Sequence, residues 1–190
     1  MSRQVKTYVT PEEYLAIERA AEYKNEYVDG EIFAMTGASR KHNLICLNVS
    51  AELREQLKGK PCEVYPGKMR VKAPAARSYV YPDVVVVCGE PQFEDDYLDT
   101  LLNPTVVVEV LSKSTESYNR LAKSAYYRTI ASLTEYLLVA QDEYRVEQYV
   151  KQTDQRWLLA DVVSLESEVE LRSLDCSLPL RDIYERVSLE

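Results

Sequence analysis

The sequence predicts an α/β (α+β) domain in which helices flank a mixed central sheet. Two valine runs, residues 84–87 and 106–108, are typical of strands that are buried on both faces of a sheet covered by helices. Segments with helical spacing precede and follow these runs, and a polar–apolar hairpin comes after them. The chain has 190 residues and no repeat, low-complexity tract or linker, so we expect one domain over residues 1–190.

The first predicted elements are a helix and a hairpin. Thr10 is a candidate N-cap, and Glu13, three residues later, completes a capping box at the start of the helix. Asp29-Gly30 is a strong turn signal. Segments 26–28 and 31–35 should therefore pair as antiparallel strands.

A second helix and an interrupted strand should follow the hairpin. Ser39 is a candidate N-cap for this helix, and Gly59 marks its end. Residues 62–73 alternate as in a strand, with a break near Pro66-Gly67. The expected apolar stripe of the helix consists of Leu44, Leu47, Val49, Ala51, Leu53 and Leu57.

Strands dominate the rest of the chain, with one further long helix. Thr115 is the candidate cap of that helix, and Leu121, Ala125 and Ile130 are its expected apolar positions. The elements expected in this half are strands over 78–89 and 105–112, the helix over 115–131, a strand over 134–141, a hairpin over 144–163 that turns near Thr153-Asp154, and short closing segments over 167–173 and 180–187.

The charge balance limits how the chain can meet nucleic acid. Its 31 acidic and 23 basic residues give a net charge of −8, whereas a protein that holds DNA tightly by neutralising phosphates is expected to be basic. An acidic site that recruits Mg²⁺ and meets its substrate through a local basic patch is compatible with this charge. The 15 tyrosines suit ordinary surface strands, and they also suit a subunit interface.

The four cysteines are scattered, without a C-x-x-C pair, and the chain has one histidine. Neither a zinc site nor a disulfide scaffold is therefore expected, and Cys46 and Cys88 should be small buried hydrophobic residues. The N-terminal segment lacks the apolar core of a signal peptide, and no apolar run reaches the ~18 residues of a membrane span. We expect a soluble, cytoplasmic protein with no membrane partner.

Two carboxylates stand at the ends of the valine runs. Asp83 directly precedes the first run, and Glu109 directly follows the second. An ionised carboxylate without a partner in such a place costs several kcal/mol, so it needs a cation, a hydrogen-bond donor or a proton. If the two strands are neighbours, the carboxylates can meet at one edge of the sheet. There they would suit Mg²⁺, which prefers oxygen ligands and activates water for phosphoryl chemistry.

Two lysines are candidate cationic partners for Glu109. Lys113 follows four residues later, but the residues around it resemble a turn, whereas Lys123 lies on the next helix, which can pack back over the sheet. We favour Lys123. Each residue also has an ordinary structural interpretation: Asp83 as a polar strand entry, Glu109 as the partner of a core arginine, and Lys123 as a solvated charge.

Several ordered segments resemble one family. "YPDVVVV", "PTVVVEVLSKST", "NRLAKSAYY" and "TEYLLV", together with the upstream "NEYVDGEIFAMTGASRKHNLI", are similar to the Uma-two family of the restriction-endonuclease-like PD-(D/E)XK nuclease superfamily. The resemblance covers about residues 7–150. It implies a restriction-endonuclease-like fold with a mixed central sheet.

The resemblance also implies roles for individual residues. Asp83 and Glu109 would be the metal-binding acids, and Glu26 a further ligand of the metal or of water. The superfamily's usual lysine would fall at Leu111, and in the Uma-two pattern Lys123 takes its place.

Two further positions of the Uma-two pattern are accessory candidates. His42 matches the histidine of the upstream segment, and a histidine at a helix start also serves as a capping or packing residue. Asn119 stands four residues before Lys123, where the family usually has aspartate. Lys113 is the third accessory candidate.

Three functions follow from these observations. The first is an endonuclease that uses Mg²⁺ or Mn²⁺ to hydrolyse DNA phosphodiester bonds, with Lys123 orienting the water or stabilising charge. Because symmetric dimers are the commonest oligomers, it is expected to be a homodimer. The second is an inactive nuclease-fold binding or assembly module, and the third is hydrolysis of a small phosphorylated substrate. The basic residues that would suit a phosphate-facing groove are Arg40, Lys41, Lys68, Arg70, Lys72 and Arg77.

Overall fold

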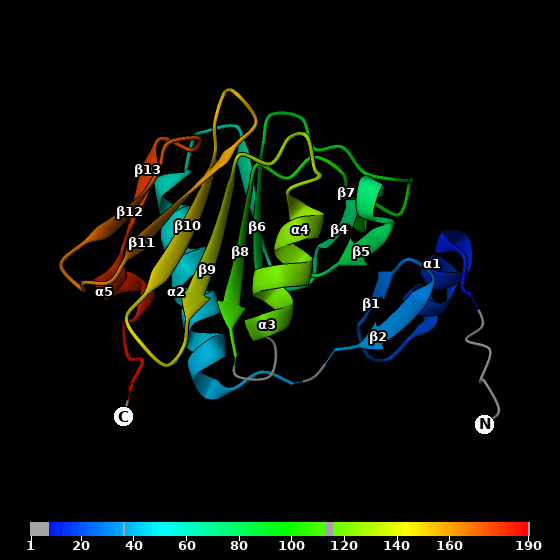
Figure 1. Ribbon diagram of the computed structural model, residues 1–190, viewed down its shortest axis with the longest axis horizontal. Helices are drawn as coiled ribbons and strands as arrows, with labels where there is room; N and C mark the ends of the chain where they lie inside the picture. Colours follow the sequence, from blue (N-terminus) through cyan, green and yellow to red (C-terminus); the bar gives the residue numbers. More distant parts are fainter. Residues whose placement is uncertain (1–7, 36, 113–115, 190) are drawn as a thin grey trace.

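The computed structural model describes residues 8–35, 37–112 and 116–189, and a large mixed sheet forms its centre (Figure 1). Within these residues the strands of that sheet are, from one edge to the other, β11 (Trp157–Val162), β10 (Val146–Lys151), β9 (Glu135–Ala140), β8 (Val106–Leu111), β6 (Val84–Cys88) and β3 (Cys62–Pro66). Strands β8 and β9 are parallel, and the other neighbouring pairs are antiparallel. The predicted fold class, helices around a mixed sheet, is confirmed.

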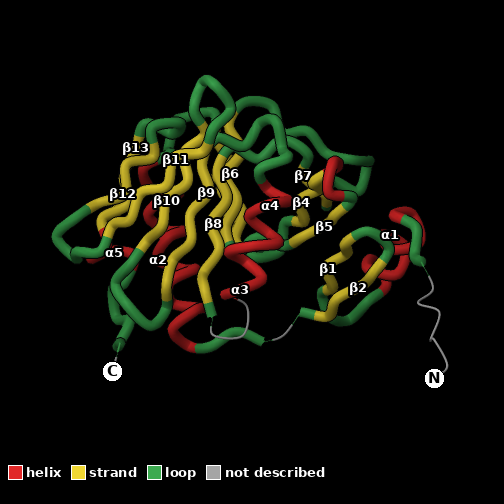
Figure 2. Tube along the Cα trace, in the orientation of Figure 1, coloured by secondary structure: helices red, strands yellow, loops and turns green. Residues whose placement is uncertain are grey.

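The remaining elements of the described chain form a smaller sheet, a two-stranded ribbon and the helices (Figure 2). They are α1 (Pro11–Ala20), β1 (Asn25–Val28), β2 (Glu31–Ala34), α2 (Arg40–Gln56), β4 (Arg70–Ala73), a 3₁₀ turn (Pro74–Ala76), β5 (Ser78–Val80), β7 (Thr100–Leu101), α3 (Glu116–Tyr118), a π-helical turn (Asn119–Lys123), α4 (Ser124–Tyr127), β12 (Glu168–Leu171), β13 (Cys176–Pro179) and α5 (Leu180–Ile183). None of the helices among these residues combines the length and apolar character that crossing a bilayer requires.

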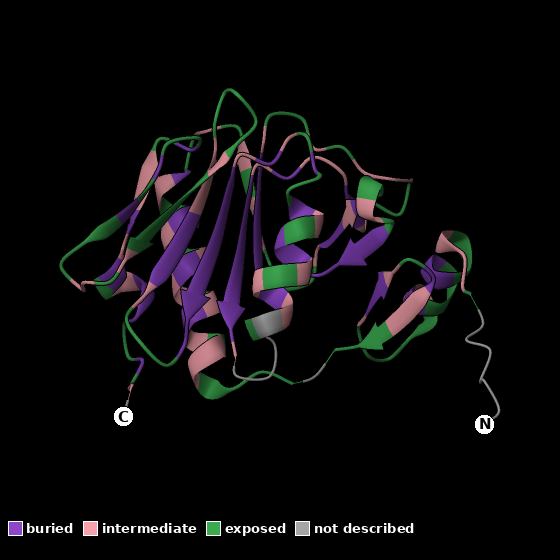
Figure 3. Ribbon diagram, viewed as in Figure 1, coloured by how far each residue is buried: buried purple, intermediate pink, exposed green. Residues whose placement is uncertain are grey.

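The central strands of the large sheet, β6, β8 and β9, are buried on both faces (Figure 3). On one face Val84 and Val86 pack with Ile45 of α2. On the other face Val85 and Tyr127 belong to a second core cluster, beneath the helical segment 116–127. Each buried valine contributes roughly 1.5–3 kcal/mol, so a continuous valine run, rather than an alternating pattern, is what these strands require.

A smaller sheet lies beside the large one, with the strand order β2-β1-β5-β4-β7 among the described residues. The single strand predicted over 78–89 is in fact two strands, because β5 belongs to the small sheet and β6 to the large one. Pro82, between them, has no N–H to donate to a ladder. The chain therefore passes from one sheet to the other immediately before Asp83.

The N-terminal helix and hairpin form as predicted. Thr10 and Glu13 make the reciprocal hydrogen bonds of a capping box. Asp29 and Gly30 both have positive φ, 43° and 93°, as a two-residue type I′ hairpin turn requires. Glycine suits the second of these positions because it has no side chain to clash there.

Helix α2 begins after Ser39, whose side chain accepts a hydrogen bond from the backbone N–H of His42, as predicted for an N-cap. The predicted apolar stripe is partly wrong, because Leu47 is 64% exposed. The buried residues Ile45, Val49 and Leu53 are spaced four apart and share one face. Leu47 and Ala51 point away from that face.

The helical segment before β9 differs from the prediction. It ends at Tyr127 instead of residue 131, and the predicted cap Thr115 lies outside the described residues. Leu121 is 73% exposed. The side chains that the segment buries are polar or amphipathic: Asn119, Lys123, Ser124 and Tyr127.

Cys62 and Cys88 form a disulfide, so the expectation that cysteines would not be cross-linked is wrong. The two residues face each other on the antiparallel strands β3 and β6, with Cα atoms 4.1 Å apart. Their separation of 26 residues shows nothing of this pairing, which depends on the register of two strands. Cys88 is therefore cross-linked and not a free buried thiol.

Candidate active site at the junction of the two sheets

Asp83 and Glu109 come together at the edge where the small sheet meets the large one. Strands β6 and β8 are neighbours with Val84 opposite Val108, which places Asp83 across from Glu109. The Oδ2 atom of Asp83 accepts a hydrogen bond of 2.7 Å from the backbone N–H of Val110. The two residues are thus opposite each other at the ends of neighbouring strands, as the sequence analysis required for their carboxylates to meet.

Lys123 joins two carboxylates that come from different sheets. Its Nζ atom lies 3.0 Å from Oε1 of Glu109 and 2.8 Å from Oε1 of Glu26. All three side chains are at least 94% buried. The ion pair accounts for a carboxylate in a buried strand, because leaving Glu109 without a partner would cost several kcal/mol.

A π-helical turn directs Lys123 toward the sheet. The backbone N–H of Ser124 bonds to the carbonyl of Asn119, five residues earlier, which widens the helix and shifts the side chains that follow. Lys123 and Tyr127 then lie one turn apart on the buried face. Asn119 itself is 3% exposed, and its carbonyl accepts a hydrogen bond from Tyr136.

Among the described residues, three tyrosines also hydrogen-bond Glu109 and Glu26, and the sequence did not reveal them. Tyr127 donates to Oε1 of Glu109 at 2.6 Å, and Tyr118 donates to Oε2 of Glu26 at 3.2 Å. The backbone N–H of Tyr81 donates to Oε1 of Glu26 at 3.0 Å. Tyr127 follows Lys123 by four residues, and residues at this spacing share a helix face. This spacing was a signal that Tyr127 lies beside Lys123.

The electrostatics of the pair follow from burial. Burial raises the pKa of Glu109 to about 7, against the opposing effect of Lys123, and the nearby carboxylates Asp83 and Glu26 raise it further. Burial alone would lower the pKa of Lys123, but Glu109 and Glu26 outweigh it and raise that pKa. Lys123 is therefore a permanent cation between two acids.

His42 and Cys46 approach Asp83 from the other side of the sheet. The Nε2 atom of His42 lies 3.0 Å from Oδ1 of Asp83. Burial alone would lower the pKa of His42, but the hydrogen bond to Asp83 raises it overall. Cys46 is one turn further along α2, and burial raises the pKa of its thiol. Ligand atoms of these three residues all lie within 4.8 Å of one another.

The other predicted site residues have different places. Lys113 lies outside the described residues. Leu111, at the superfamily's lysine position, is buried at the end of β8. Cys46, which sequence reasoning treated as a small hydrophobic residue, is a potential ligand next to Asp83.

The basic residues that were expected to form a phosphate-facing groove do not all lie on the surface. Arg70 is 1% exposed and Lys72 forms an ion pair with Glu94, so both are used inside the protein. Lys68 is exposed and follows Gly67, whose N–H donates to the carbonyl of Asp83 at 2.7 Å. Arg40, Lys41 and Arg77 are exposed or half-exposed.

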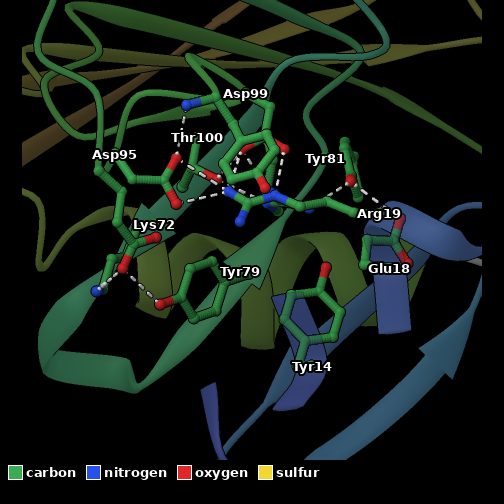
Figure 4. Close-up of polar contacts among 12 residues, drawn as sticks. Tyr14, Glu18, Arg19, Lys72, Tyr79, Tyr81, Asp95, Asp99 and Thr100 are labelled. Atoms are coloured by element: carbon green, nitrogen blue, oxygen red, sulfur yellow. Dashed lines mark hydrogen bonds and ion pairs between the residues drawn. The ribbon is translucent and has the colours of Figure 1, made fainter. Parts of the chain in front are cut away.

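A polar network supports the site from the side of α1 (Figure 4). The hydroxyl of Tyr81 donates to Glu18 at 2.9 Å and accepts from Arg70 at 3.1 Å. Arg70 also binds Asp99 at 2.8 Å, and Asp99 in turn binds Arg19 of α1. Because Tyr81 holds Glu26 through its backbone, this network links α1 to the acids.

The model of the Uma2 family, described as "Putative restriction endonuclease", matches residues 11–181. This chain belongs to the Uma2 family. It therefore carries the nuclease-like fold that the sequence resemblance implied.

Two similar proteins come from Synechocystis sp. and cover most of the chain. The Uma2 chain is 39% identical to the protein sll1609 over 162 residues, which is 85% of this chain and 92% of the relative. It is 34% identical to slr1290 over 176 residues, or 93% of this chain and 91% of the relative.

A solved structure from Anabaena variabilis shows the same fold. The superposition has a TM-score of 0.75 at 17% sequence identity and covers 95% of this chain and 99% of the other. That protein is described as "a putative nuclease belonging to DUF820". At this identity the likeness concerns the fold.

Proposed function

We propose that this Uma2 protein is an endonuclease that uses Mg²⁺ or Mn²⁺ to hydrolyse DNA phosphodiester bonds. The observation that carries the proposal is the buried Lys123 within 3.0 Å of Glu109, next to Asp83, which directly precedes the neighbouring strand β6. Two acids and a lysine at one sheet edge are the groups that metal-assisted phosphodiester hydrolysis needs. The family description supports the nuclease class.

The donor set of the site fits a hard divalent cation. Asp83 and Glu109 supply carboxylate oxygens, and Glu26 lies on the far side of Lys123. Mg²⁺ takes one or two carboxylates and completes its coordination with water and phosphate oxygens. When bound, the ion would polarise the phosphate and make a bound water more acidic. The Asp83 side chain is 19% exposed, so it is the acid that solvent and substrate can reach.

The chain's own groups have distinct roles in this mechanism. The backbone N–H of Val110 holds Oδ2 of Asp83, and Oδ1 faces His42 at 3.0 Å, so both oxygens of this acid are fixed in position. Lys123 stabilises negative charge near Glu109 and stays paired with Glu26 if Glu109 turns toward a cation. The Tyr127 hydroxyl holds Glu109 in place. Such preorganised groups act without rearrangement during the reaction.

Contacts to the DNA backbone would come from two lysines beside the acids, one exposed and one half-exposed. Lys68 lies in the turn that hydrogen-bonds Asp83, and Lys41 precedes His42. A few local cations are enough to place a phosphate, even though the whole chain carries a net charge of −8. A homodimer of this single domain would present two such sites, as cleavage of both strands requires.

A second candidate function is a nuclease-fold binding module without activity. The observation that favours it is the same ion pair, because Lys123 already neutralises Glu109 and Glu26. In that case the lysine serves the stability of the fold. Arg70 and Lys72, being paired internally, leave fewer cations for a nucleic-acid surface.

Metal binding and cleavage, measured on matched variants, separate the two candidates. Calorimetry with Mn²⁺ and plasmid cleavage in Mg²⁺ would be run on the wild type, Asp83→Asn, Glu109→Gln and the exposed control Glu143→Gln. The nuclease proposal expects Mn²⁺ affinity to fall at least ~10-fold and cleavage at least ~100-fold in the first two variants only. Cleavage at the wild-type rate in either site variant would refute it. Wild-type protein that neither binds Mn²⁺ nor cleaves would refute the nuclease proposal and favour the second candidate.

A further inference from the structure

His42 and Cys46 form a pair of potential ligands on α2 that the proposed hydrolysis does not use. They are four residues apart, so both side chains project from the same helix face. Two metal ligands four residues apart on one helix are a recurring arrangement in zinc sites. Both face Asp83, directly before β6.

The positions of the three side chains are fixed by the fold around them. Ser39 caps α2 directly before His42, and Ile45 and Val49, on either side of Cys46, are fully buried against the sheet. Val110 holds Oδ2 of Asp83, while Oδ1 faces His42 at 3.0 Å. Ligands that are themselves held by hydrogen bonds and packing are typical of metal centres.

We infer that His42, Cys46 and Asp83 form a binding site for a thiophilic divalent transition-metal ion of the zinc class. The three donors are an imidazole nitrogen, a sulfur and a carboxylate oxygen, all of which bind Zn²⁺ at about 2.0–2.3 Å. Their ligand atoms lie within 4.8 Å of one another, so small side-chain movements bring them around one ion. Three protein ligands leave a fourth position for water.

The choice of metal follows from the sulfur. Mg²⁺ takes oxygen ligands and gains nothing from a thiol, whereas Zn²⁺ and Co²⁺ bind thiolate and imidazole strongly. When the ion binds, Cys46 gives up its thiol proton to solvent and the sulfur ligates as thiolate. This site would therefore bind Zn²⁺ or Co²⁺ in preference to Mg²⁺, the ion proposed for Asp83 and Glu109.

Asp83 belongs to both arrangements, and this has a consequence for regulation. If the proposed nuclease activity holds, an ion bound to His42 and Cys46 draws Asp83 away from Glu109. Micromolar Zn²⁺ should then inhibit cleavage supported by Mg²⁺. This consequence rests on the proposed function, whereas the metal site itself does not.

Cobalt absorption tests the site without nucleic acid, so the result is independent of whether the chain cleaves DNA. Co²⁺ is titrated anaerobically into the wild type, Cys46→Ser, His42→Gln and the control Cys176→Ser, which replaces the other free cysteine. The inference expects a thiolate-to-cobalt charge-transfer band in the wild type and the control. The band should be absent in Cys46→Ser, and Co²⁺ affinity should fall at least ~10-fold in His42→Gln.

A second measurement needs no variant. Zn²⁺ should protect Cys46 from alkylation in the folded wild type, as read by mass spectrometry, while Cys176 reacts at the same rate with and without Zn²⁺. A charge-transfer band that persists in Cys46→Ser, or a folded wild type with neither band nor protection, would overturn the inference. Far-ultraviolet circular dichroism checks that each variant is folded before it is compared.

Discussion

The Nζ atom of Lys123 lies 3.0 Å from Oε1 of Glu109, and both side chains are almost completely buried. The pair connects the helical segment on one face of the large sheet to the central strand β8. It is also the point where stability and proposed catalysis depend on the same atoms, because Glu109 is both the partner of Lys123 and a proposed ligand of the metal.

Lys123→Met should destabilise the protein strongly. Methionine has a similar length but leaves Glu109 and Glu26 without their cation, and breaking a buried pair in this way costs about 3–5 kcal/mol. Urea unfolding of the wild type and the variant measures the loss. Lys58→Met is the matched control, because Lys58 is 62% exposed and should change stability by less than about 0.5 kcal/mol. A loss below about 1 kcal/mol for Lys123→Met would contradict the importance of the pair.

Tyr127→Phe should remove one hydrogen bond and little else. The hydroxyl donates to Glu109 at 2.6 Å in the buried core, and a bond to a charged group contributes about 1.5–3 kcal/mol. Unfolding free energies from urea titration provide the measurement. Tyr23→Phe, at a residue that is 73% exposed, is the control. Equal stability of the two variants would show that the Tyr127 hydroxyl is not needed to hold Glu109.

The sequence was sufficient to predict the central strands of the large sheet. Two valine runs indicate strands that are buried on both faces of a covered sheet. Asp83 and Glu109 were expected to lie close together only if these strands were neighbours, and β6 and β8 are neighbours. Lys123 followed from the helix that comes next, although its π-helical turn was not predictable from spacing.

The missed features all depend on contacts between distant segments. Cys62 and Cys88 pair through the register of β3 and β6, and Cys46 reaches Asp83 because α2 packs across β6. Arg70 looked like part of a phosphate-binding surface, but Thr100 and Asp99, about 30 residues later, enclose it. Sequence spacing shows which residues share a face, and it does not show which faces meet.

Asp99→Asn should make stability less sensitive to acid. The hydrogen bond from Arg19, together with Arg70, lowers the pKa of Asp99 in the folded state. The folded chain therefore takes up this proton less readily than the unfolded chain. The resulting stability is present above the unfolded pKa of about 3.9 and is lost as the pH falls toward the folded pKa.

Unfolding free energies at about pH 6 and about pH 3 measure this effect. The difference between the two values should be smaller in Asp99→Asn than in the wild type. Asp99 is about a third exposed, so solvent screening reduces the effect. The exposed Asp142→Asn is the control, and an unchanged difference in Asp99→Asn would exclude a contribution from the Arg19–Asp99 pair.

The Cys62–Cys88 disulfide should stabilise the edge of the large sheet that carries β3. It joins residues 26 apart in sequence, and a loop of this order contributes about 2–4 kcal/mol when it is cross-linked. Cys62→Ser/Cys88→Ser should lose that amount in urea unfolding, while Cys176→Ser should lose much less because Cys176 is a free, half-buried cysteine. Thiol titration of the unfolded, unreduced protein provides an independent check. It should find the two free thiols, Cys46 and Cys176, and a count of all four cysteines as thiols would refute the pairing of β3 with β6 through this bond.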